Sequence, residues 1–163
     1  MQVAARNGSL DVLKRLYELG GDINSKGPDD ENLFHIAGSN GHIHVLAWLL
    51  GIGFDPASTT AKGQSLAHIA ARRGELLVVK FLYFMCHLDF NRVDDDGMTP
   101  MECIPRYGPE NIPEVKQFIS MITAPPESRD LYVFVLEREA VSMRKYLLKS
   151  GILFTGEKVS SSL

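Results

Sequence analysis

The residues of this sequence best suited to chemistry are five histidines and two cysteines, which can serve as metal ligands, bases or nucleophiles. His42 and His44 lie two positions apart, so a helix would point their side chains to different sides, and no Cys, Asp or Glu at ligand spacing completes a metal site. Cys103 could pair with a histidine base only if the fold brought the two together. We therefore expect no catalytic residue, no metal ligand and no cofactor.

The glycines do not form a phosphate-binding loop, because they do not cluster before one helix. Gly8, Gly41 and Gly74 instead recur at one constant interval, and each begins the same downstream pattern. This period, with apolar residues at helical spacing inside it, is typical of a helical solenoid whose units bury their apolar faces by stacking. The sequence thus predicts an array of one repeated pair of short helices.

Two columns of the aligned copies predict where these helices begin and how closely they pack. Asn32, Ser65 and Thr99 share one column and are good N-cap residues, and Thr99 is followed by Pro100 and Glu102 in the pattern of a capping box. Small side chains, suited to a close approach of helices, fill the second column: Ala4, Ala5, Ala37, Gly38, Ala70 and Ala71.

The second and third copies, NLFHIAGSNGHIHVLAWLLGIGFD from Asn32 and SLAHIAARRGELLVVKFLYFMCHLD from Ser65, resemble the ankyrin repeat. That family has a capping Thr or Ser, a Leu, a His, an Ala pair, a Gly, a Val pair, a Leu pair and a closing Gly with Asp and Asn. The resemblance implies an all-α solenoid of stacked helix-turn-helix repeats with protruding turns. It also implies that His35 and His68 tie neighbouring turns together through hydrogen bonds.

We expect a single repeat array over residues 1–154. The first copy enters inside its first helix, so we expect the array to continue upstream in the intact protein. Gly97 falls one position later than the period places it after Gly63, which indicates a one-residue insertion near Met85 to Leu88. The expected copies lie near 1–26, 27–59, 60–93 and 94–123, followed by a degenerate repeat over 124–154 that caps the stack and a polar tail over 155–163.

The regular array breaks at residues 104–114. Pro105 falls in the small-residue column, inside the expected first helix of the fourth copy, where it removes an amide donor and clashes with the preceding turn. We therefore expect at least four stacked helix pairs, with a short or kinked helix over Met101 to Tyr107. The break fits either a decaying array near its end or a functional loop for a partner.

Aromatic positions on the second helices predict packing between repeats. Trp48 and Phe81 share one column, and Tyr146 falls in the same column of the degenerate copy. We expect this aromatic row to pack between repeats on the convex side, and a second contact surface is the alternative.

Composition argues against several classes of partner. A net charge of −3 gives no general attraction to nucleic acid or to an anionic membrane, and no run approaches the roughly 20 apolar residues of a membrane span. The N-terminus lacks the pattern of a signal peptide, and two cysteines are too few for a secreted disulfide scaffold. We expect a monomeric, intracellular protein in the cytoplasm or the nucleus, with both thiols buried.

By resemblance, the chain is a non-catalytic module that binds a protein partner on the concave face made by turn tips and first helices. The alternative is a docking or regulatory domain of a larger multidomain enzyme or of a bacterial effector directed at a host. The third copy is basic on this face and its flanks are largely acidic. The candidate contact residues are Asp29, Glu31, Ser39, Asn40, Lys62, Gln64, Arg72, Arg73, Asp95, Asp96, Met98, Arg106 and Tyr107.

One modification site follows from the resemblance. Asn24, with Leu16 eight residues before it and Asp22 and Ile23 beside it, matches the pattern at which loops of ankyrin type are hydroxylated on asparagine. The alternative is that Asn24 only makes side-chain hydrogen bonds across its turn.

Overall fold

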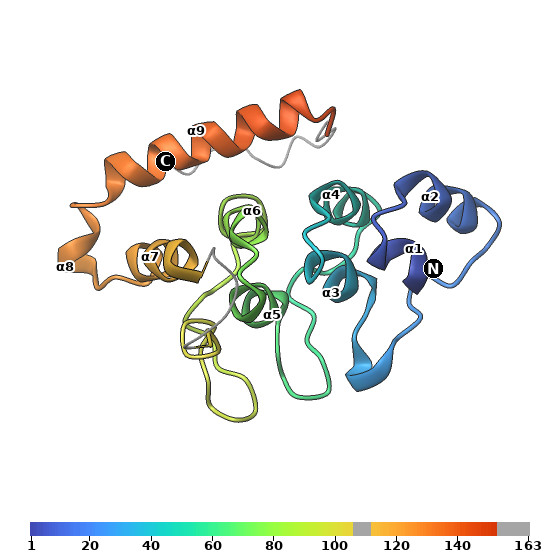
Figure 1. Cartoon of the computed structure of the whole chain (residues 1–163), viewed down its shortest axis with the longest axis horizontal. Coiled ribbons are helices and arrows are strands. Elements are labelled where there is room, and N and C mark those ends of the chain that lie inside the picture. The colour runs from blue at the N-terminus through green and yellow to red at the C-terminus, as the bar shows by residue number, and fades with distance from the viewer. Residues whose placement is uncertain (106–111, 153–163) are drawn as a thin grey trace.

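Figure 1 shows the computed structural model of the chain, which describes residues 1–105 and 112–152. Within these ranges the regular structure is helical, apart from one isolated β-bridge between Thr59 and Ser65. No helix in the same ranges is long and apolar enough to cross a membrane. The elements are α1 (Gln2–Arg6), α2 (Leu10–Glu18), a 3-10 turn η1 (Pro28–Asp30), α3 (Leu33–Gly38), α4 (Ile43–Gly51), α5 (Leu66–Arg73), α6 (Leu76–Cys86), α7 (Ile112–Ile122), α8 (Pro126–Arg129) and α9 (Val133–Lys149).

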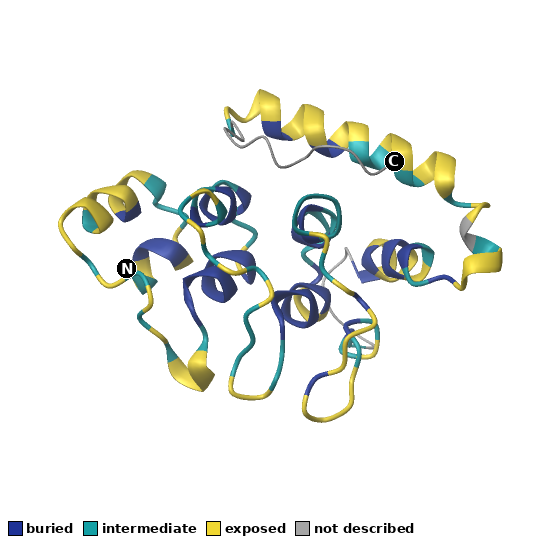
Figure 2. Cartoon of the chain, turned by 180° about the vertical axis from the view of Figure 1, so that it is seen from behind, coloured by how far each residue is buried: buried dark blue, intermediate teal, exposed yellow. Residues whose placement is uncertain are grey.

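The first six helices form three antiparallel pairs stacked side by side. Helices α1, α3 and α5 make an inner row, α2, α4 and α6 make an outer row, and long turns project beyond the inner row (Figure 1). Contacts run from α1 to α3, from α3 to α5 and from α4 to α6. The sides of these helices that face one another are buried, whereas the tips of the turns are exposed (Figure 2). The predicted all-α solenoid with protruding turns is confirmed.

The N-cap column begins the inner helices as predicted. Asn32 accepts a hydrogen bond at Oδ1 from the backbone N–H of His35 at 3.0 Å, and its own N–H donates to His35 Nδ1. The N–H of Ser65 donates to His68 Nδ1 at 3.2 Å. These contacts satisfy backbone groups that a helix end leaves without an intrahelical partner, so the cap residues fix where each helix begins.

The small-residue column lets the inner helices approach closely, also as predicted. Ala37, Ala70 and Ala71 are fully buried, and a Cβ added at Gly38 would collide with the side chain of Leu66 from the next repeat. A larger side chain in this column would separate α3 from α5, which is why alanine and glycine fill it.

The turn glycines serve both backbone conformation and packing. Gly8 and Gly41 adopt left-handed φ angles of 68° and 75°, which cost glycine little. The imidazole of His42 lies against Gly8, and the carboxylate of Glu75 lies against Gly41, so each glycine leaves room for a side chain of the next repeat.

The fourth unit lacks a regular inner helix. Residues Pro100 to Cys103 form a single turn, which the Thr99–Glu102 capping box holds with a 2.8 Å bond from the Thr99 N–H to Glu102 Oε2. We expected at least four stacked helix pairs, the fourth with an irregular first helix. The described residues form three helix pairs and a fourth unit in which this single turn, in place of a helix, precedes α7, so the expected number of pairs is wrong for them. The prediction of an irregular helix at Pro105 is confirmed up to that residue, and residues 106 and 107 lie outside the described ranges.

Helix α7 completes the fourth unit and packs against both α5 and α6. Its Phe118 ring contacts two aromatic side chains of α6, with ring centroids 6.0 Å from Tyr83 and 5.9 Å from Phe84. Val115, Phe118 and Ile119 are buried at this interface, so α7 continues the outer side of the stack.

The predicted one-residue insertion lies at the end of α6. Helices α2 and α4 are followed by a left-handed glycine, Gly20 or Gly53, whereas α6 extends to Cys86 and its left-handed residue is His87, with a φ of 52°. One period after Gly53 lies Cys86, so the left-handed position has moved by one residue.

The last described helix folds back over the stack. Helix α9 lies across the outer row and contacts α6 (Figure 1). Met143 and Leu147 are buried there, and Lys80 of α6 forms a 2.7 Å ion pair with Glu139. We expected residues 124–154 to cap the end of the stack, and the structure corrects that placement, because the apolar side of α9 packs on α6. The copy boundaries stay predictions, and the tail over 155–163 lies outside the described ranges.

Two of the three positions of the aromatic row are buried or half-buried. Trp48 is half-buried, and its ring is in edge contact with Tyr17 of the preceding repeat at 5.8 Å between centroids. Phe81 is fully buried, whereas Tyr146 on α9 is exposed. The expected packing between repeats is therefore confirmed for Trp48, and it does not extend to Tyr146.

Candidate functional site

The projecting turns recur with the repeats, and their tips are exposed. Each closes with a backbone hydrogen bond of the same pattern, and the first tip also contains the 3-10 turn η1. The bonds run from the Gly27 N–H to the Glu31 carbonyl at 2.7 Å, from Thr60 to Gln64 at 3.0 Å and from Asp94 to Met98 at 3.0 Å.

Backbone hydrogen bonds also join neighbouring tips. The N–H of Ala61 donates to the carbonyl of Asp29 at 2.8 Å, and the N–H of Asp95 donates to the carbonyl of Lys62 at 3.1 Å. The three tips therefore form one continuous row in which the spacing of side chains is set by the backbone. Such a row can present charges at fixed separations to a partner.

A side-chain relay crosses from the third copy to the fourth. Gln64 donates from Nε2 to Asp94 Oδ2 at 3.0 Å, and its Oε1 accepts a 3.4 Å bond from Arg72 Nη1. Asp94 also accepts at Oδ1 from the N–H groups of Asp96 and Met98. The bond from Gln64, followed by these backbone donors, lowers the pKa of the Asp94 carboxyl group, so Asp94 is an ionised anchor for the turn.

His35 and His68 hold the turns on the inner helices. The Nδ1 atom of each ring accepts from the backbone of its own N-cap, while Nε2 faces the carbonyl of Ser58 or Met98 at 3.1 Å. This pattern assigns the neutral form with the proton on Nε2. Burial lowers the pKa of His35 to about 4 and lowers the pKa of His68, against the opposing effect of the carbonyl bonds. The expected structural role of both histidines is confirmed.

His42 and His44 also make structural bonds between repeats. Nε2 of His42 contacts the carbonyl of Arg6 at 2.8 Å, and Nε2 of His44 contacts the carbonyl of Gly8 at 2.7 Å. Both rings are thereby occupied at the turn that joins α1 to α2. In the described part of the chain, no group of three His, Cys, Asp or Glu side chains is arranged to hold a metal ion.

Most of the predicted contact residues lie on the tips or on the ends of the inner helices that face the same side. Asp29, Asn40, Lys62, Arg72 and Arg73 are exposed, as are Asp95, Asp96 and Met98, whereas Glu31 and Gln64 are partly exposed. Ser39 is buried, and its hydroxyl group donates to the Ile36 carbonyl at 3.1 Å, so this residue faces the interior. Arg106 and Tyr107 lie outside the described ranges.

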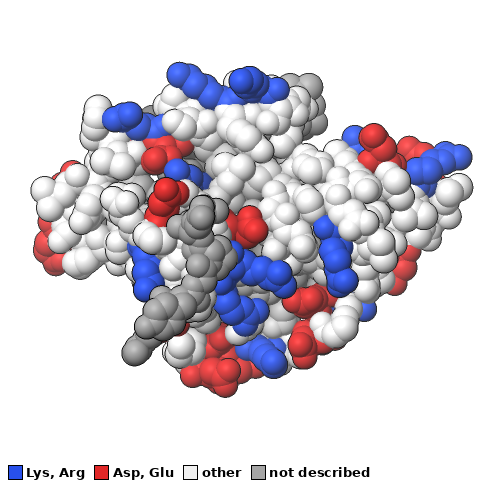
Figure 3. Space-filling model, viewed as in Figure 1, with Lys and Arg blue, Asp and Glu red and all other residues white. Residues whose placement is uncertain are grey.

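The charge pattern of the tips follows the order of the repeats. In Figure 3, basic side chains gather over α5 and the middle turn, with acidic side chains over the turns on either side. The basic group is Lys62, Arg72 and Arg73, and the acidic neighbours are Asp29 and Asp30 on one side and Asp95 and Asp96 on the other.

A family model for ankyrin repeats, present in three copies, matches residues 1–94 and 33–130. The chain belongs to the ankyrin repeat family. No curated protein matches the chain. Ankyrin repeats are generally modules for interactions between proteins and are typically not catalytic.

The two thiols of this ankyrin array are poor nucleophiles. Cys86 and Cys103 are free, and each is partly exposed, which corrects the expectation that both are buried. Burial nevertheless raises the pKa of the Cys86 thiol to about 12, and burial, together with the nearby Asp94, raises the pKa of Cys103. Both groups are therefore protonated at neutral pH, which disfavours thiolate chemistry.

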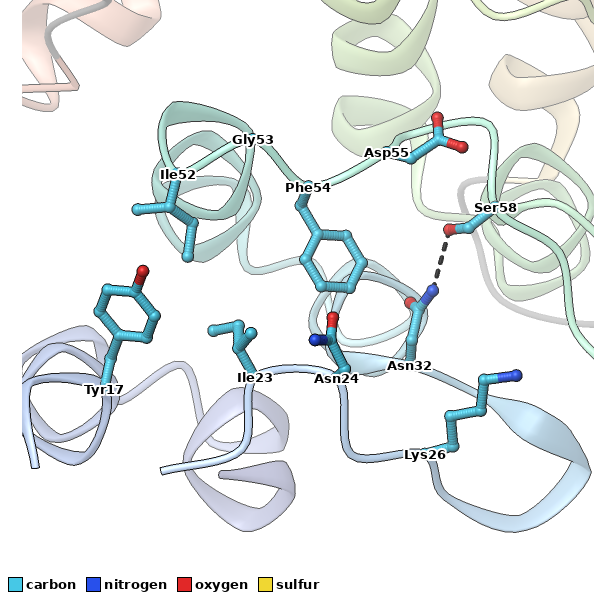
Figure 4. A pocket seen from close by; sticks show the side chains of 10 residues that line it. All are labelled: Tyr17, Ile23, Asn24, Lys26, Asn32, Ile52, Gly53, Phe54, Asp55 and Ser58. Atoms are coloured by element: carbon cyan, nitrogen blue, oxygen red, sulfur yellow. Dashed lines mark hydrogen bonds between the residues drawn. The ribbon is translucent and has the colours of Figure 1, made fainter. Parts of the chain in front are cut away.

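The Asn24 loop borders a pocket of about 510 Å³ between the first two ankyrin repeats. In Figure 4 the Asn24 amide points toward the Phe54 ring, while Tyr17 and Ile52 form the side of the pocket away from Lys26. Asn24 is exposed, and its backbone N–H donates to Asp22 Oδ1 at 2.9 Å. The side chain is thus accessible from solvent within an ordered turn.

Sequence analysis did not single out Asp94, although its carboxylate organises a whole tip. Asp94 is followed by Asp-Asp-Gly, a sequence typical of turns. The hydrogen bonds that its carboxylate accepts from the amides two and four residues ahead could therefore have been expected from the sequence. The link to Gln64 joins two different repeats, so it depends on the stacking and has no local signal.

Proposed function

We propose that this array binds a protein partner across the row of tips and the adjoining ends of the inner helices, with the basic group Lys62, Arg72 and Arg73 at the centre of the contact. The observation that carries this proposal is the hydrogen-bonded row of tips. This row holds the exposed charges of the tips, which alternate in sign from one repeat to the next, at fixed positions.

Fixed positions matter because ordering flexible charged side chains on binding costs free energy. The bond from Arg72 to Gln64, which Asp94 holds in turn, orders the guanidinium group before a partner arrives. A matching partner presents carboxylates to the centre and basic groups to the two acidic flanks. Complementary charges of this kind set orientation and the rate of association.

A charge reversal tests the proposal. A partner captured from a lysate with the wild-type chain is purified, and its dissociation constant is measured for the variant Arg72→Glu with Arg73→Glu. Because arginine anchors often contribute about 2 kcal/mol or more, we expect binding to weaken by roughly tenfold or more. Both residues are exposed, so the unfolding midpoint should change little.

The matched control is Arg144→Glu with Lys145→Glu, an equal change of charge at exposed positions on α9. We expect this control to leave binding nearly unchanged. Undiminished binding by the Arg72 and Arg73 variant, together with weakened binding by the α9 control, would place the contact on the outer face and reject the proposal.

We also propose Asn24 as a site of asparagine hydroxylation, because its side chain is accessible and the loop matches the family pattern. Mass spectrometry of the protein purified from its native cell should find the peptide containing Asn24 heavier by one oxygen atom. An unmodified peptide from the native source, together with no reaction in vitro with an asparaginyl hydroxylase, would reject this site.

A further inference from the structure

Helix α9 carries a line of exposed apolar side chains on the side that faces away from the stack. Phe134, Val141 and Leu148 are 69%, 49% and 68% exposed, whereas Met143 and Leu147, on the opposite side of the helix, are 3% exposed. The outer edge of α9 is exposed (Figure 2). Single exposed apolar residues are common on protein surfaces, but several that lie in one line on one helix are typical of a surface for a partner.

The three apolar side chains recur at every seventh residue. Because seven residues make nearly two turns of an α-helix, these side chains lie within about 40° of one another around the helix axis. A line of this width is narrower than the apolar face of a helix that covers a protein core, and it is typical of the seam between two packed helices. We call Phe134, Val141 and Leu148 the outer seam of α9.

Basic side chains border the outer seam. Arg138, Arg144 and Lys145 are exposed, and each lies three or four residues from two members of the seam, which makes them neighbours on the helix surface. Glu137 is an acidic residue in such a position, whereas Glu139 pairs with Lys80 on the side of α6. In Figure 3, basic side chains gather along the edge that α9 forms at the top of the view. This edge is basic in a chain whose net charge is −3, so it favours an acidic partner.

The same face of α9 has a hollow between its side chains, with a volume of about 450 Å³. Its lining residues are Phe134, Glu137, Arg138, Val141, Ser142 and Lys145. The first four have the spacing i, i+3, i+4 and i+7. Four neighbouring side chains of one helix form the hole that receives a side chain of a facing helix, and contacts between a helix and its partner repeat at this spacing.

The width and the charge of the outer seam separate the possible occupants. A helix that lies on a membrane buries a broad apolar face, whereas the outer seam is one side chain wide and has charged residues on both sides. A second copy of this chain would bring a basic α9 against a basic α9, and like charges at an interface disfavour the contact. An acidic helix with a narrow apolar line meets neither obstacle.

We propose that the outer seam of α9 docks an amphipathic helix of a protein partner. The aliphatic side chains of that helix pack on Phe134, Val141 and Leu148, and its carboxylates lie beside the three basic residues that border the seam. The outer seam lies on the side of the stack away from the tips, so this proposal does not depend on the proposed function. The chain can then hold one partner on each side.

A designed peptide tests the proposal on the full chain. The peptide has three heptads, with leucine at both apolar positions and glutamate beside them, and repulsion between its glutamates keeps it from pairing with itself. Fluorescence anisotropy of the labelled peptide should show binding, and Phe134→Glu with Val141→Glu should weaken it by roughly tenfold or more. The matched control is Val3→Glu with Val12→Glu, which changes two exposed valines of the first helix pair and should bind the peptide like the wild type.

A reversal of charge tests the basic border. Arg144→Glu with Lys145→Glu should lose the acidic peptide and gain binding of a second peptide that has lysine in place of every glutamate. Arg72→Glu with Arg73→Glu makes the same change of charge on the tips and should keep the acidic peptide. Each of these variants affects one surface, so failure of this proposal and failure of the proposed function are distinguishable.

Several outcomes would overturn the docking of an acidic helix. One is that the acidic peptide does not bind, or that it still binds Phe134→Glu with Val141→Glu. Sedimentation with phosphatidylserine vesicles that this variant abolishes would assign the outer seam to a membrane, and a wild-type dimer that it dissociates would assign the seam to a second copy. Peptide binding only after removal of residues 153–163 would assign the seam to a segment of the chain itself.

Discussion

At the scale of single residues, the histidines of this chain have structural roles, although histidine is also a common catalytic residue. Four of the five histidines, His35, His42, His44 and His68, contact backbone carbonyl groups distant in the sequence. In His35 and His68, Nδ1 accepts a hydrogen bond and Nε2 faces a carbonyl, which requires the neutral imidazole. This requirement links the stability of the stack to pH.

The first prediction concerns this link at His35. Burial lowers the pKa of His35 in the folded chain to about 4 from its ordinary value of 6.5. Between these two pH values the unfolded chain therefore binds more protons than the folded chain. The free energy of unfolding should therefore fall as the pH falls below 6.5, by up to about 3 kcal/mol from this residue. Urea unfolding measured at several pH values checks the slope.

The variant His35→Gln separates histidine from other titrations, because glutamine can accept and donate but does not charge. It should be less stable than the wild type near neutral pH and should show a shallower slope above about pH 5. Asp94 and Glu102, whose pKa values are lowered by hydrogen bonds from Gln64 and Thr99 respectively, stay ionised in that range. An unchanged slope in the variant would assign the pH dependence to other groups.

The second prediction concerns the inserted residue after α6. His87 adopts a left-handed φ of 52°, where a residue with a Cβ is strained by about 1 kcal/mol, and glycine is not. His87→Gly should therefore raise the free energy of unfolding by up to about 1 kcal/mol. Chemical denaturation of the purified variant measures the change.

Gly53→Ala is the reciprocal control. Gly53 occupies the same place after α4 at a φ of 90°, and no atom lies within 4 Å of a Cβ added there, so only the backbone strain acts. It should lower stability by a similar amount. Equal stability of His87→Gly and the wild type would mean that the imidazole makes a compensating contact.

At the scale of the elements, local sequence determines where the inner helices begin, but it does not determine which side of α9 is buried. Asn32 and Thr99 were predictable as caps because a cap acts on an amide three residues away, and the small-residue column was predictable because it recurs with the period. Helix α9 has apolar residues on two sides, with Met143 and Leu147 buried and Phe134 and Leu148 exposed. The choice between those sides depends on α6, which no local pattern specifies.

The third prediction addresses how α9 is held. Met143 and Leu147 of α9 are buried, the ion pair between Lys80 and Glu139 joins α9 to α6, and a pocket of about 580 Å³ lies between α6, α7 and the start of α9. Met143→Ala with Leu147→Ala should remove about 2 kcal/mol or more at each position. We expect α9 to lose protection from hydrogen exchange while α3 and α5 keep theirs.

The control for α9 is Val141→Ala, which changes an exposed residue of the same helix and should leave its exchange rates nearly unchanged. A uniform loss of protection across all helices in the double variant would show that α9 and the repeats unfold as one unit.

At the scale of the whole molecule, stacking of the repeats places the tips of successive turns side by side, where backbone hydrogen bonds join them into one surface. The constant interval of the turn glycines and the charges on the tips were readable in the sequence, so the candidate face could be named in advance. The assignment of Ser39 to this face followed the positions that vary in the family. Its hydroxyl group instead donates to the Ile36 carbonyl inside the fold. The bonds between tips could not be predicted, since they join backbone groups that only stacking brings together.

The fourth prediction isolates one of these bonds. Ala61 is the second residue of a turn closed by a 3.0 Å bond from the Gly63 N–H to the Thr60 carbonyl, a position where proline is readily accepted. Ala61→Pro removes the amide that donates to Asp29 and leaves the turn itself intact. The lost bond costs about 1 kcal/mol, and proline regains much of this by restricting the unfolded chain.

The variant should therefore unfold close to the wild-type urea midpoint but bind the partner more weakly, mainly through faster dissociation, because the first and second tips no longer keep a fixed separation. The control is Ala61→Ser, which keeps the amide and should bind like the wild type. Ala57→Pro would not serve as a control, because it removes the N–H that donates to Asp55 Oδ1. If Ala61→Pro kept wild-type binding while Arg72→Glu with Arg73→Glu lost it, the basic centre would act alone. The acidic flank at Asp29 would then have no part in positioning the partner.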